Sequence, residues 1–269
     1  MKHLLTIAGS DSSGGAGIQA DLKTFAALGA YGMSCICAVT AQNTTRVASV
    51  QNIDPDMVTA QLAAVYEDIP PDAVKTGMLS TPAIVRAVAD FLSAHRGPPV
   101  VVDPVMVATS GGVLLEPEAV EVYKTAFFPE AALITPNMPE AEVLTGMTIA
   151  GEADMARAAE ALMQYGCGAV LVKGGHRTED AVDVLFDGKE VHYFRSEHIE
   201  TKNTHGTGCT LSSALAVFLA QGLPAADAVA AAKSYLTGAI RSAAKGSVGH
   251  GSGPVDHFWF YGREWGRMK

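Results

Sequence analysis

Short apolar runs alternate with amphipathic segments through most of the chain, and this alternation constrains the fold more than any other feature. The runs that suit buried strands are LLTIA (4–8), MSCICAV (33–39), AVKTGM (73–78), VVVDPV (100–105), ALITP (132–136) and AVLVKG (169–174). The segments with helical periodicity lie at 18–28, 57–69, 81–95, 116–128 and 152–165. This order predicts a mostly parallel sheet that is covered by helices on both faces.

Two further patterns complete the predicted organisation. Asp187 and Gly188 separate two strand-like runs in AVDVLFDGKEVHYFRS, which predicts a hairpin at the edge of the sheet. The alanine-rich segment AADAVAAAKSYLTGAIRSAA predicts that the last third is helical. Because no repeat, linker or low-complexity stretch interrupts the chain, we expect residues 1–269 to form a single domain.

Composition and charge narrow the class of protein. With 269 residues, of which 48% are hydrophobic, the chain can bury a large core. The formal net charge of −9, with no basic run, argues against a nucleic-acid partner but allows a local site for a small anion. The apolar stretch in MKHLLTIAGS is too short for a signal peptide or a membrane span, so we expect a cytoplasmic protein without a membrane partner.

The cysteines do not follow a metal-binding or redox pattern. There is no C-x-x-C pair and no zinc-like spacing. Cys35 and Cys37 would share one face of a strand. We interpret these two residues and Cys167 as small buried hydrophobes in a reduced protein.

Ligands of such sheets bind beyond the carboxyl ends of the strands, where the first loop is AGSDSSGGAGIQADLKTF (8–25). Gly15, Gly17 and Ala20 fit the relaxed dinucleotide pattern G-x-G-x-x-A. However, six residues separate this pattern from the strand, and the next strand ends at Gln42 instead of an acid. We therefore disfavour a dinucleotide site, and a tight turn before a helix is the simpler alternative. We expect Asp21, one turn into that helix, to face the cleft.

Four other loops carry polar residues. KTGM (75–78) ends one strand. Asp103 ends another strand and begins the loop DPVMVATSGG (103–112), whose SGG turn could close over a ligand. Asn137 and Glu140 stand three residues apart at a helix start. They could organise Mg²⁺ through its waters, or form only a capping box. VKGGH (172–176) ends a strand, and its His176 is more typical of a polar loop residue than of a ligand.

A further loop, NTHGTGCT (203–210), leads into a helix. Gly206 and Gly208 allow close approach to the backbone, and the helix N-terminus favours an anion there. The same position would lower the pKa of Cys209, so we expect some thiolate near neutral pH. A Walker loop is absent from the sequence. Two anion-friendly helix starts, a possible Mg²⁺ pair and a candidate base together indicate phosphoryl transfer.

These motifs, in the same order, resemble those of a known family. AGSDSSGGAGIQADLKTF, TAQNT, KTGM, DPVMV, ITPNMPEA, VKGGH and NTHGTGCT are similar to the hydroxymethylpyrimidine/phosphomethylpyrimidine kinases of thiamine biosynthesis, in the ribokinase-like superfamily. The resemblance runs from about residue 4 to residue 258. It implies a three-layer α/β/α sandwich, a homodimer, and ATP with Mg²⁺. It also implies two phosphorylations, first of the pyrimidine's hydroxymethyl group and then of the resulting monophosphate.

The resemblance also assigns substrate-binding residues. It implies that Gln42 hydrogen-bonds the pyrimidine, because its amide offers both a donor and an acceptor. It further implies that Asp21 contacts the substrate. The residues that it places around the substrate pocket are Gly9, Ala16, Met78 and Val105.

The same resemblance assigns the phosphate end of the site. Asn137 and Glu140 match the pair that organises metal and phosphate, with Asp103 and Glu140 expected to hold Mg²⁺ partly through water. Lys173 is expected near the phosphates, Gly206, Thr207 and Gly208 in the anion hole, and Cys209 at the position of the base, where ribokinases carry aspartate. One departure is Thr109, which replaces the usual lysine and leaves that phosphate contact in doubt.

Three alternatives or open points accompany this interpretation. A pyridoxal kinase, or an enzyme with dual activity, shares most of these loops, although Gln42 argues against it. A thiol hydrolase with Cys209 as nucleophile would have only His205 as a base. The residues that hold adenine are undetermined, and Lys233, in the helix that is a candidate for this role, is expected to be a solvated lysine.

Overall fold

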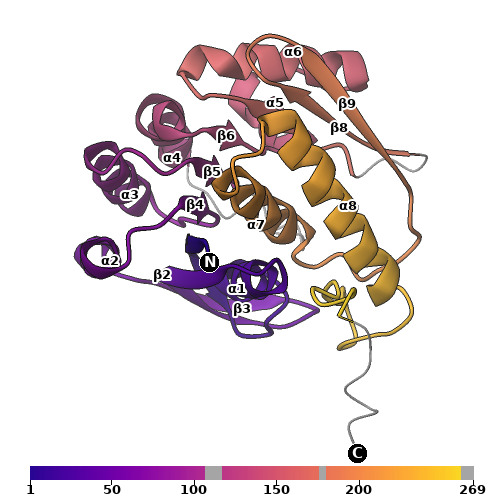
Figure 1. The fold of residues 1–269 in the computed structure, drawn as a ribbon, viewed down its shortest axis with the longest axis horizontal. Coiled ribbons are helices and arrows are strands. Elements are labelled where there is room, and N and C mark those ends of the chain that lie inside the picture. Colours follow the sequence, from indigo (N-terminus) through magenta and orange to yellow (C-terminus); the bar gives the residue numbers. More distant parts are fainter. Residues whose placement is uncertain (107–116, 176–179, 262–269) are drawn as a thin grey trace, which may run out of the picture.

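A computed structural model describes residues 1–106, 117–175 and 180–261, and the strands in these ranges form one nine-stranded sheet (Figure 1). Its order is β3-β2-β1-β4-β5-β6-β7-β8-β9. Pairing is parallel from β2 to β7 and antiparallel for β3, β8 and β9 at the two edges. The strands are β1 (His3–Asp11), β2 (Tyr31–Gln42), β3 (Val47–Asn52), β4 (Ala73–Thr76), β5 (Val100–Val102), β6 (Leu133–Ile134), β7 (Val170–Val172), β8 (Asp180–Phe186) and β9 (Val191–Glu197).

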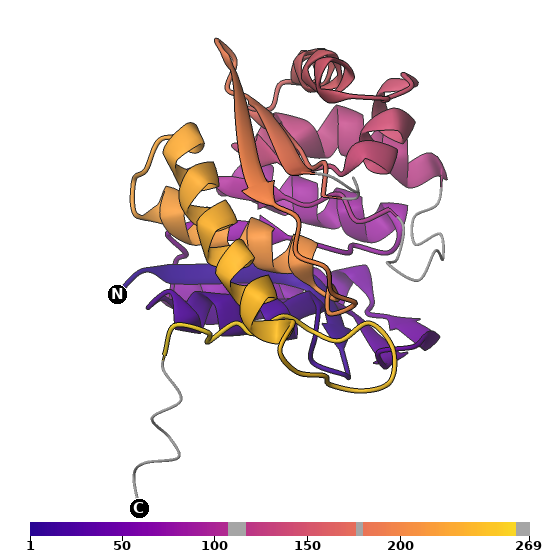
Figure 2. The same cartoon turned by 90° about the vertical axis from the view of Figure 1, so that its right-hand side faces the viewer.

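Helices cover both faces of this sheet. One face packs against α1 (Gly17–Ala27), α7 (Thr207–Ala220) and α8 (Ala225–Ala243), and the other against α2 (Pro55–Asp68), α3 (Pro82–Ala94), α4 (Pro117–Val122), α5 (Met138–Thr145) and α6 (Glu152–Leu162). In Figure 2 the yellow-orange α8 lies on one side and the magenta helices lie on the other. Each face has its own hydrophobic core. The predicted three-layer α/β/α sandwich is confirmed.

Some predicted element boundaries differ from the structure. β3 was missed because most of its residues are exposed and give no buried run. The helix expected over 116–128 ends as α4 at Val122, and a π-helical turn (Tyr123–Phe127) and a 3₁₀ turn (Phe128–Glu130) follow it. Another 3₁₀ turn (Met163–Tyr165) follows α6. The predicted hairpin is confirmed as β8 and β9, at the edge of the sheet.

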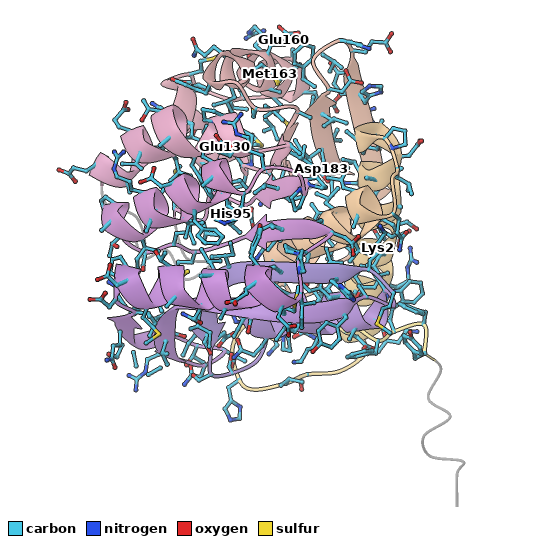
Figure 3. The ribbon with its side chains drawn as sticks, turned by 60° about the vertical axis from the view of Figure 1, so that its left-hand side comes forward. Lys2, His95, Glu130, Glu160, Met163 and Asp183 are labelled. Atoms are coloured by element: carbon cyan, nitrogen blue, oxygen red, sulfur yellow. The ribbon has the colours of Figure 1, made fainter. Side chains whose placement is uncertain are left out.

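The hydrophobic cores account for three of the four cysteines. Cys35, Cys37 and Cys167 are free thiols buried in the core under α2, α3 and α6, as predicted. No helix in the described ranges has the length and apolar character needed to cross a bilayer. Charged side chains such as Glu160 lie outside, whereas Asp183 lies inside the fold (Figure 3). This internal carboxylate lines a cavity at the carboxyl ends of the strands.

Candidate active site

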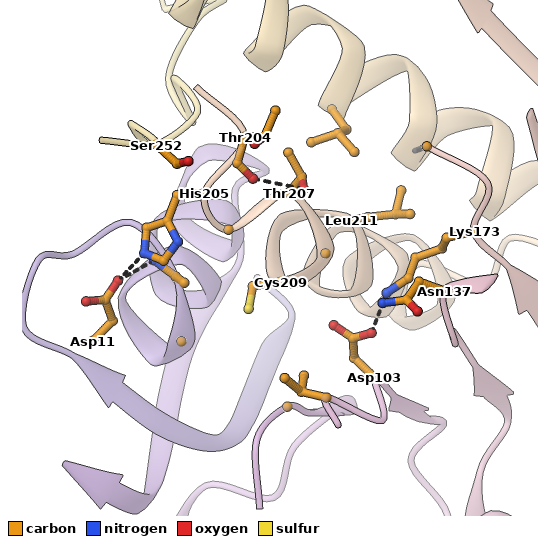
Figure 4. Close-up of a pocket in the computed structure, with 18 of the residues that line it drawn as sticks. Asp11, Asp103, Asn137, Lys173, Thr204, His205, Thr207, Cys209, Leu211 and Ser252 are labelled. Carbon is orange, nitrogen blue, oxygen red and sulfur yellow. Dashed lines mark hydrogen bonds and ion pairs between the residues drawn. The ribbon is translucent and has the colours of Figure 1, made fainter. Parts of the chain in front are cut away.

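A cavity of about 890 Å³ lies at the carboxyl ends of the parallel strands, a volume in the range of small-ligand sites. It is the position expected for a ligand site in an open α/β sheet. The predicted site residues that line it are Gly9, Ala16, Gln42, Met78, Asp103, Val105, Asn137, Glu140, Lys173, Gly206, Thr207, Gly208 and Cys209. Loops that are up to two hundred residues apart in the sequence therefore converge on one site (Figure 4). Thr109, the SGG turn and His176 lie outside the described residues.

The turn before α7 presents free backbone donors to this cavity. Gly206 is the N-cap residue with φ of +80°, and it provides no side-chain cap. Within the described residues, the amide groups of Gly208 and Cys209 have no hydrogen-bond acceptor. A Cβ at position 206 would lie 1.9 Å from the Gly15 carbonyl oxygen, so only glycine fits this contact. Free N–H groups at a helix N-terminus form a site for an anion such as a phosphate.

Acidic and basic side chains meet beside this turn. Lys173 Nζ donates to Asp103 Oδ1 at 2.6 Å (Figure 4), and the Thr135 hydroxyl donates to the same oxygen at 3.0 Å. The other carboxylate oxygen of Asp103, Oδ2, has no hydrogen bond within the described residues and faces Gly208, whose missing Cβ would lie 3.4 Å away. The Lys173 ammonium is equally close to that position. An anion at the turn would therefore meet a lysine, and a cation would meet a free carboxylate oxygen.

Asn137 and Glu140 form the capping box that was one of the two interpretations. Asn137 Oδ1 accepts a hydrogen bond from the backbone N–H of Glu140 at 2.9 Å, and Glu140 Oε2 accepts one from the backbone N–H of Asn137 at 2.8 Å. Both residues also line the cavity. The capping box thus fixes the Glu140 carboxylate at the site instead of excluding a role for it there.

The electrostatics around Glu140 favour a bound cation. Burial raises the pKa of Glu140 to about 7, Lys173 opposes the shift and the negative Asp103 adds to it. The described residues contain no cluster of three or more His, Cys, Asp or Glu side chains that could hold a metal alone. Such a site suits Mg²⁺, which uses one or two carboxylates together with water and phosphate oxygens.

Cys209 points into the cavity between the anion turn and Asp103 (Figure 4), and it is half-buried. Burial raises the pKa of its thiol to about 11, although the buried Lys75 ammonium lowers it in part. The expectation of a partly ionised thiol is therefore wrong. Burial and the negative charges of Asp21 and Asp103 raise the pKa by more than Lys75 lowers it.

The expectation that Asp21 faces the cleft is also wrong. Its carboxylate is fully buried and accepts from Lys75 at 2.8 and 2.9 Å, from Thr6 at 2.6 Å and from Ser213 at 2.7 Å. Lys75 is equally buried, and the two charges neutralise each other. Asp21 thus ties α1 to β1, β4 and α7 behind the cavity. The sequence signal was a lysine inside the buried strand AVKT, which requires a buried partner.

Asp11 and His205 form a second buried pair, which the sequence motifs do not predict. Asp11 Oδ2 accepts from His205 Nε2 at 2.8 Å and from the amides of Gly15 and Ala16, and Oδ1 accepts from Ser13. Burial alone would raise the pKa of Asp11, but the bonds from His205 and Ser13 hold it well below its ordinary value. His205 is therefore a partner of Asp11. It makes no hydrogen bond to Cys209 within the described chain, which removes the base that a thiol hydrolase needs.

Lys233 is buried, so the expectation that it is a solvated lysine is wrong. Its Nζ donates to Asp183 Oδ2 at 2.6 Å, and Asp183 Oδ1 accepts from the Gly174 amide at 3.0 Å. Lys233 and Asp183 both line the cavity. Through the Gly174 amide this pair stabilises the turn that follows Lys173, and it forms the part of the cavity wall that lies next to α8.

Comparisons with known proteins agree with this fold and site. The family described as phosphomethylpyrimidine kinase matches residues 11–256. A hydroxymethylpyrimidine/phosphomethylpyrimidine kinase of Rhizobium meliloti is 54% identical over 256 residues, which cover 94% of this chain and 96% of that protein. The pyridoxal kinase of Bacillus subtilis, solved as an ADP complex, has a TM-score of 0.89 at 39% identity, with 100% of both chains covered. The phosphomethylpyrimidine kinase of Clostridium difficile has a TM-score of 0.80 at 47% identity, with 89% of this chain and 100% of that chain covered.

The fold and these neighbours define the class as ribokinase-like kinases. Within that class, the chain belongs to the phosphomethylpyrimidine kinase family.

Proposed function

We propose that this protein uses ATP and Mg²⁺ to phosphorylate 4-amino-5-hydroxymethyl-2-methylpyrimidine, and then the resulting monophosphate, in thiamine biosynthesis. The observation that carries the proposal is that one cavity contains both an anion site and an amide that can recognise a base. The free amides at Gly208 and Cys209 form the anion site, and Gln42 supplies the donor and acceptor for the pyrimidine. The names of the curated relatives support the same pair of substrates.

The residues of the cavity fit both expected cofactors. Gly206, Thr207 and Gly208 would hold phosphate oxygens, and Lys173 would supply a positive charge beside them. Asp103, with its free Oδ2, and Glu140 would hold Mg²⁺, partly through water, and Asn137 would organise Glu140. Mg²⁺ would neutralise phosphate charge. The cavity wall near Asp183 and Lys233 is the proposed place for the nucleoside.

Cys209 is proposed as a mild base for the substrate hydroxyl. Burial raises the pKa of its thiol to about 11, so only the small fraction present as thiolate at physiological pH can accept the hydroxyl proton and become a thiol. In a loose phosphoryl-transfer transition state the attacking oxygen keeps much of its proton, so positioning and charge neutralisation supply most of the rate enhancement. The backbone of the turn is therefore expected to contribute more than the sulfur atom.

The proposal is tested by an ATP-consumption screen of four compounds: hydroxymethylpyrimidine, its monophosphate, pyridoxal and pyridoxine. We expect turnover of the two pyrimidines, with pyridoxal clearly slower. Turnover confined to the pyridine compounds would contradict the proposal. Pyridoxal kinase is kept as the second candidate because the Bacillus subtilis pyridoxal kinase matches over the full length of both chains.

The proposal also covers the number of domains, the location and the oligomeric state of the protein. We propose that residues 1–269 act as a single domain, since all the described strands join one sheet. We also propose a cytoplasmic location and a homodimer.

A further inference from the structure

Gln42 has two polar neighbours that determine how its amide must be oriented. The amide nitrogen lies 3.4 Å from His205 Nε2, and the amide oxygen lies 3.3 Å from Thr40 Oγ1. All three residues line the cavity. Whether each neighbour donates or accepts a hydrogen bond therefore decides which atoms of Gln42 are left for a ligand.

His205 Nε2 cannot accept a hydrogen bond from Gln42, and it can only share with Gln42 the proton that it donates to Asp11. Its Nε2 lies 2.8 Å from Asp11 Oδ2. Asp11 is an ionised carboxylate, because its pKa lies far below neutrality, and an ionised carboxylate only accepts. His205 Nε2 must therefore carry a proton. An amide NH₂ group that faces this N–H would place two donors against each other.

Thr40 leads to the same result independently. Its hydroxyl has one proton, and it donates this proton to the Ser10 carbonyl at 2.9 Å. The Thr40 oxygen can then only accept a hydrogen bond from Gln42. An amide oxygen that faces Thr40 would place two acceptors against each other.

Both conflicts are removed when the amide oxygen and nitrogen of Gln42 exchange places, by a half-turn about the last bond of the side chain. We infer that the Asp11–His205 pair and Thr40 lock the Gln42 amide in this orientation, with its oxygen toward His205 and its NH₂ group toward Thr40. Asp11, His205 and Thr40 are therefore positioning residues, and they act on the substrate through Gln42. In this orientation one oxygen lone pair and one N–H group are left for the ligand. Together these match an aminopyrimidine, whose amine donates and whose ring nitrogen accepts. The inference rests on the proposed pyrimidine substrate and deepens it.

The surroundings hold His205 in place for this role. A Cβ at position 15 would lie 2.4 Å from His205 Cδ2, so Gly15 makes room for the ring. The His205 amide donates to the Gly253 carbonyl at 3.0 Å, which fixes its backbone. Asp11 and His205 are 3% and 7% exposed, so water competes little for their hydrogen bond.

The test is a double-mutant cycle of His205→Phe and Gln42→Met, with kcat/KM measured for the pyrimidine and for pyridoxal. We expect His205→Phe to lower kcat/KM for the pyrimidine by about tenfold, mainly through KM. In the Gln42→Met background the same change should have an effect below about twofold, because the amide that it positions is gone. His205→Gln keeps an N–H group at a similar reach and should restore most of the activity. His192→Phe, on the edge strand β9, is the matched control.

Equal factors for His205→Phe in the two backgrounds would overturn the inference, because they would show a general structural role. If His205→Phe does not fold, Thr40→Val replaces it in the cycle with the same expected non-additivity. Calorimetric titration of the wild-type protein with the pyrimidine separates the two proposals. Absence of both binding and turnover would reject the proposed function, whereas normal wild-type activity with an additive cycle would reject only this inference.

Discussion

At the scale of single residues, burial decides the chemistry of the site more than sequence position does. Cys209 occupies a helix start that is favourable for a thiolate, yet burial raises the pKa of its thiol to about 11. Asp21 and Lys75 are fifty-four positions apart in the sequence, so the lysine in the buried strand AVKT indicates a buried partner but does not identify Asp21 as that partner. A sequence can therefore nominate the residues of a site, but not their solvation.

Replacement of Cys209 by alanine should affect the two phosphorylations unequally. The hydroxyl of the first substrate must lose a proton, whereas the phosphate of the second is already an anion. We expect kcat to fall by about tenfold for the alcohol and by less than about threefold for the monophosphate. Separate turnover assays on the two substrates measure this, with Cys167→Ala as a control in the core. Equal losses for the two substrates would rule out the base role.

Replacement of Gln42 by methionine should weaken pyrimidine selection. Methionine keeps the volume but removes both the donor and the acceptor. We expect kcat/KM for the pyrimidine to fall by about ten- to a hundredfold, with a relative shift toward pyridoxal. The exposed Gln221→Met change at the end of α7 is the control. An unchanged ratio of kcat/KM for the two compounds would remove Gln42 as the selecting residue.

At the scale of elements, the alternating pattern predicted most of the sheet and the helices on its two faces. The strong elements, such as α3 and β1, have continuous buried positions that identify them. β3 gave no such signal because its side chains are exposed, and it forms only because β2 pairs with it. The loops of the site were predictable from glycines and polar residues at strand ends. The pairing of Asp11 with His205 depends on tertiary structure across 194 positions.

The buried His257 connects the segment after α8 to α7 and α8. The stability that these contacts contribute should depend on pH. His257 is 4% exposed, contacts Thr210 Oγ1 at 3.2 Å through Nε2, and accepts from the Tyr235 hydroxyl through its carbonyl. Burial lowers the pKa of His257 to about 4, and nearby Lys23 adds to the shift. The unfolded chain takes up a proton near pH 6.5. The stability contributed by neutral His257 is therefore complete above about pH 6.5 and is lost as the pH falls toward about 4.

This contribution is measured by urea unfolding of the wild type and of His257→Gln at about pH 7.5 and about pH 5. Glutamine does not titrate, so the free-energy advantage of the wild type over the variant should shrink by about 2 kcal/mol at the lower pH. The comparison uses a difference because Glu140, whose pKa is raised to about 7, changes the stability of both proteins in the opposite direction. An advantage that does not change with pH would contradict the burial of a neutral imidazole.

At the scale of the whole molecule, the edge strand β3 is exposed, and two exposed valines lie on β3 and its neighbour β2. β3 ends the sheet, and Val39 and Val50 on the β2–β3 pair are 48% and 42% exposed. Exposed edge strands with apolar side chains favour pairing with another chain. This observation supports the proposed homodimer.

Sedimentation equilibrium at micromolar concentration should therefore give twice the mass of one chain. Val39→Glu places a charge in the proposed interface and should shift the protein to a monomer. Val143→Glu, on the exposed face of α5, is a matched change outside it and should leave the mass unchanged. A wild type that sediments as one chain would reject the dimer.

The contact between Gly206 and Gly15 has a consequence for how this protein can change over generations. The turn that would hold phosphate and the loop that would hold the pyrimidine touch backbone to backbone, with no room for a side chain at position 206. A substitution that reshapes one loop for a new substrate would therefore displace the other. We therefore expect the two loops to stay constant together. New specificities are expected to arise from side chains that line the cavity, such as Gln42 and Met78.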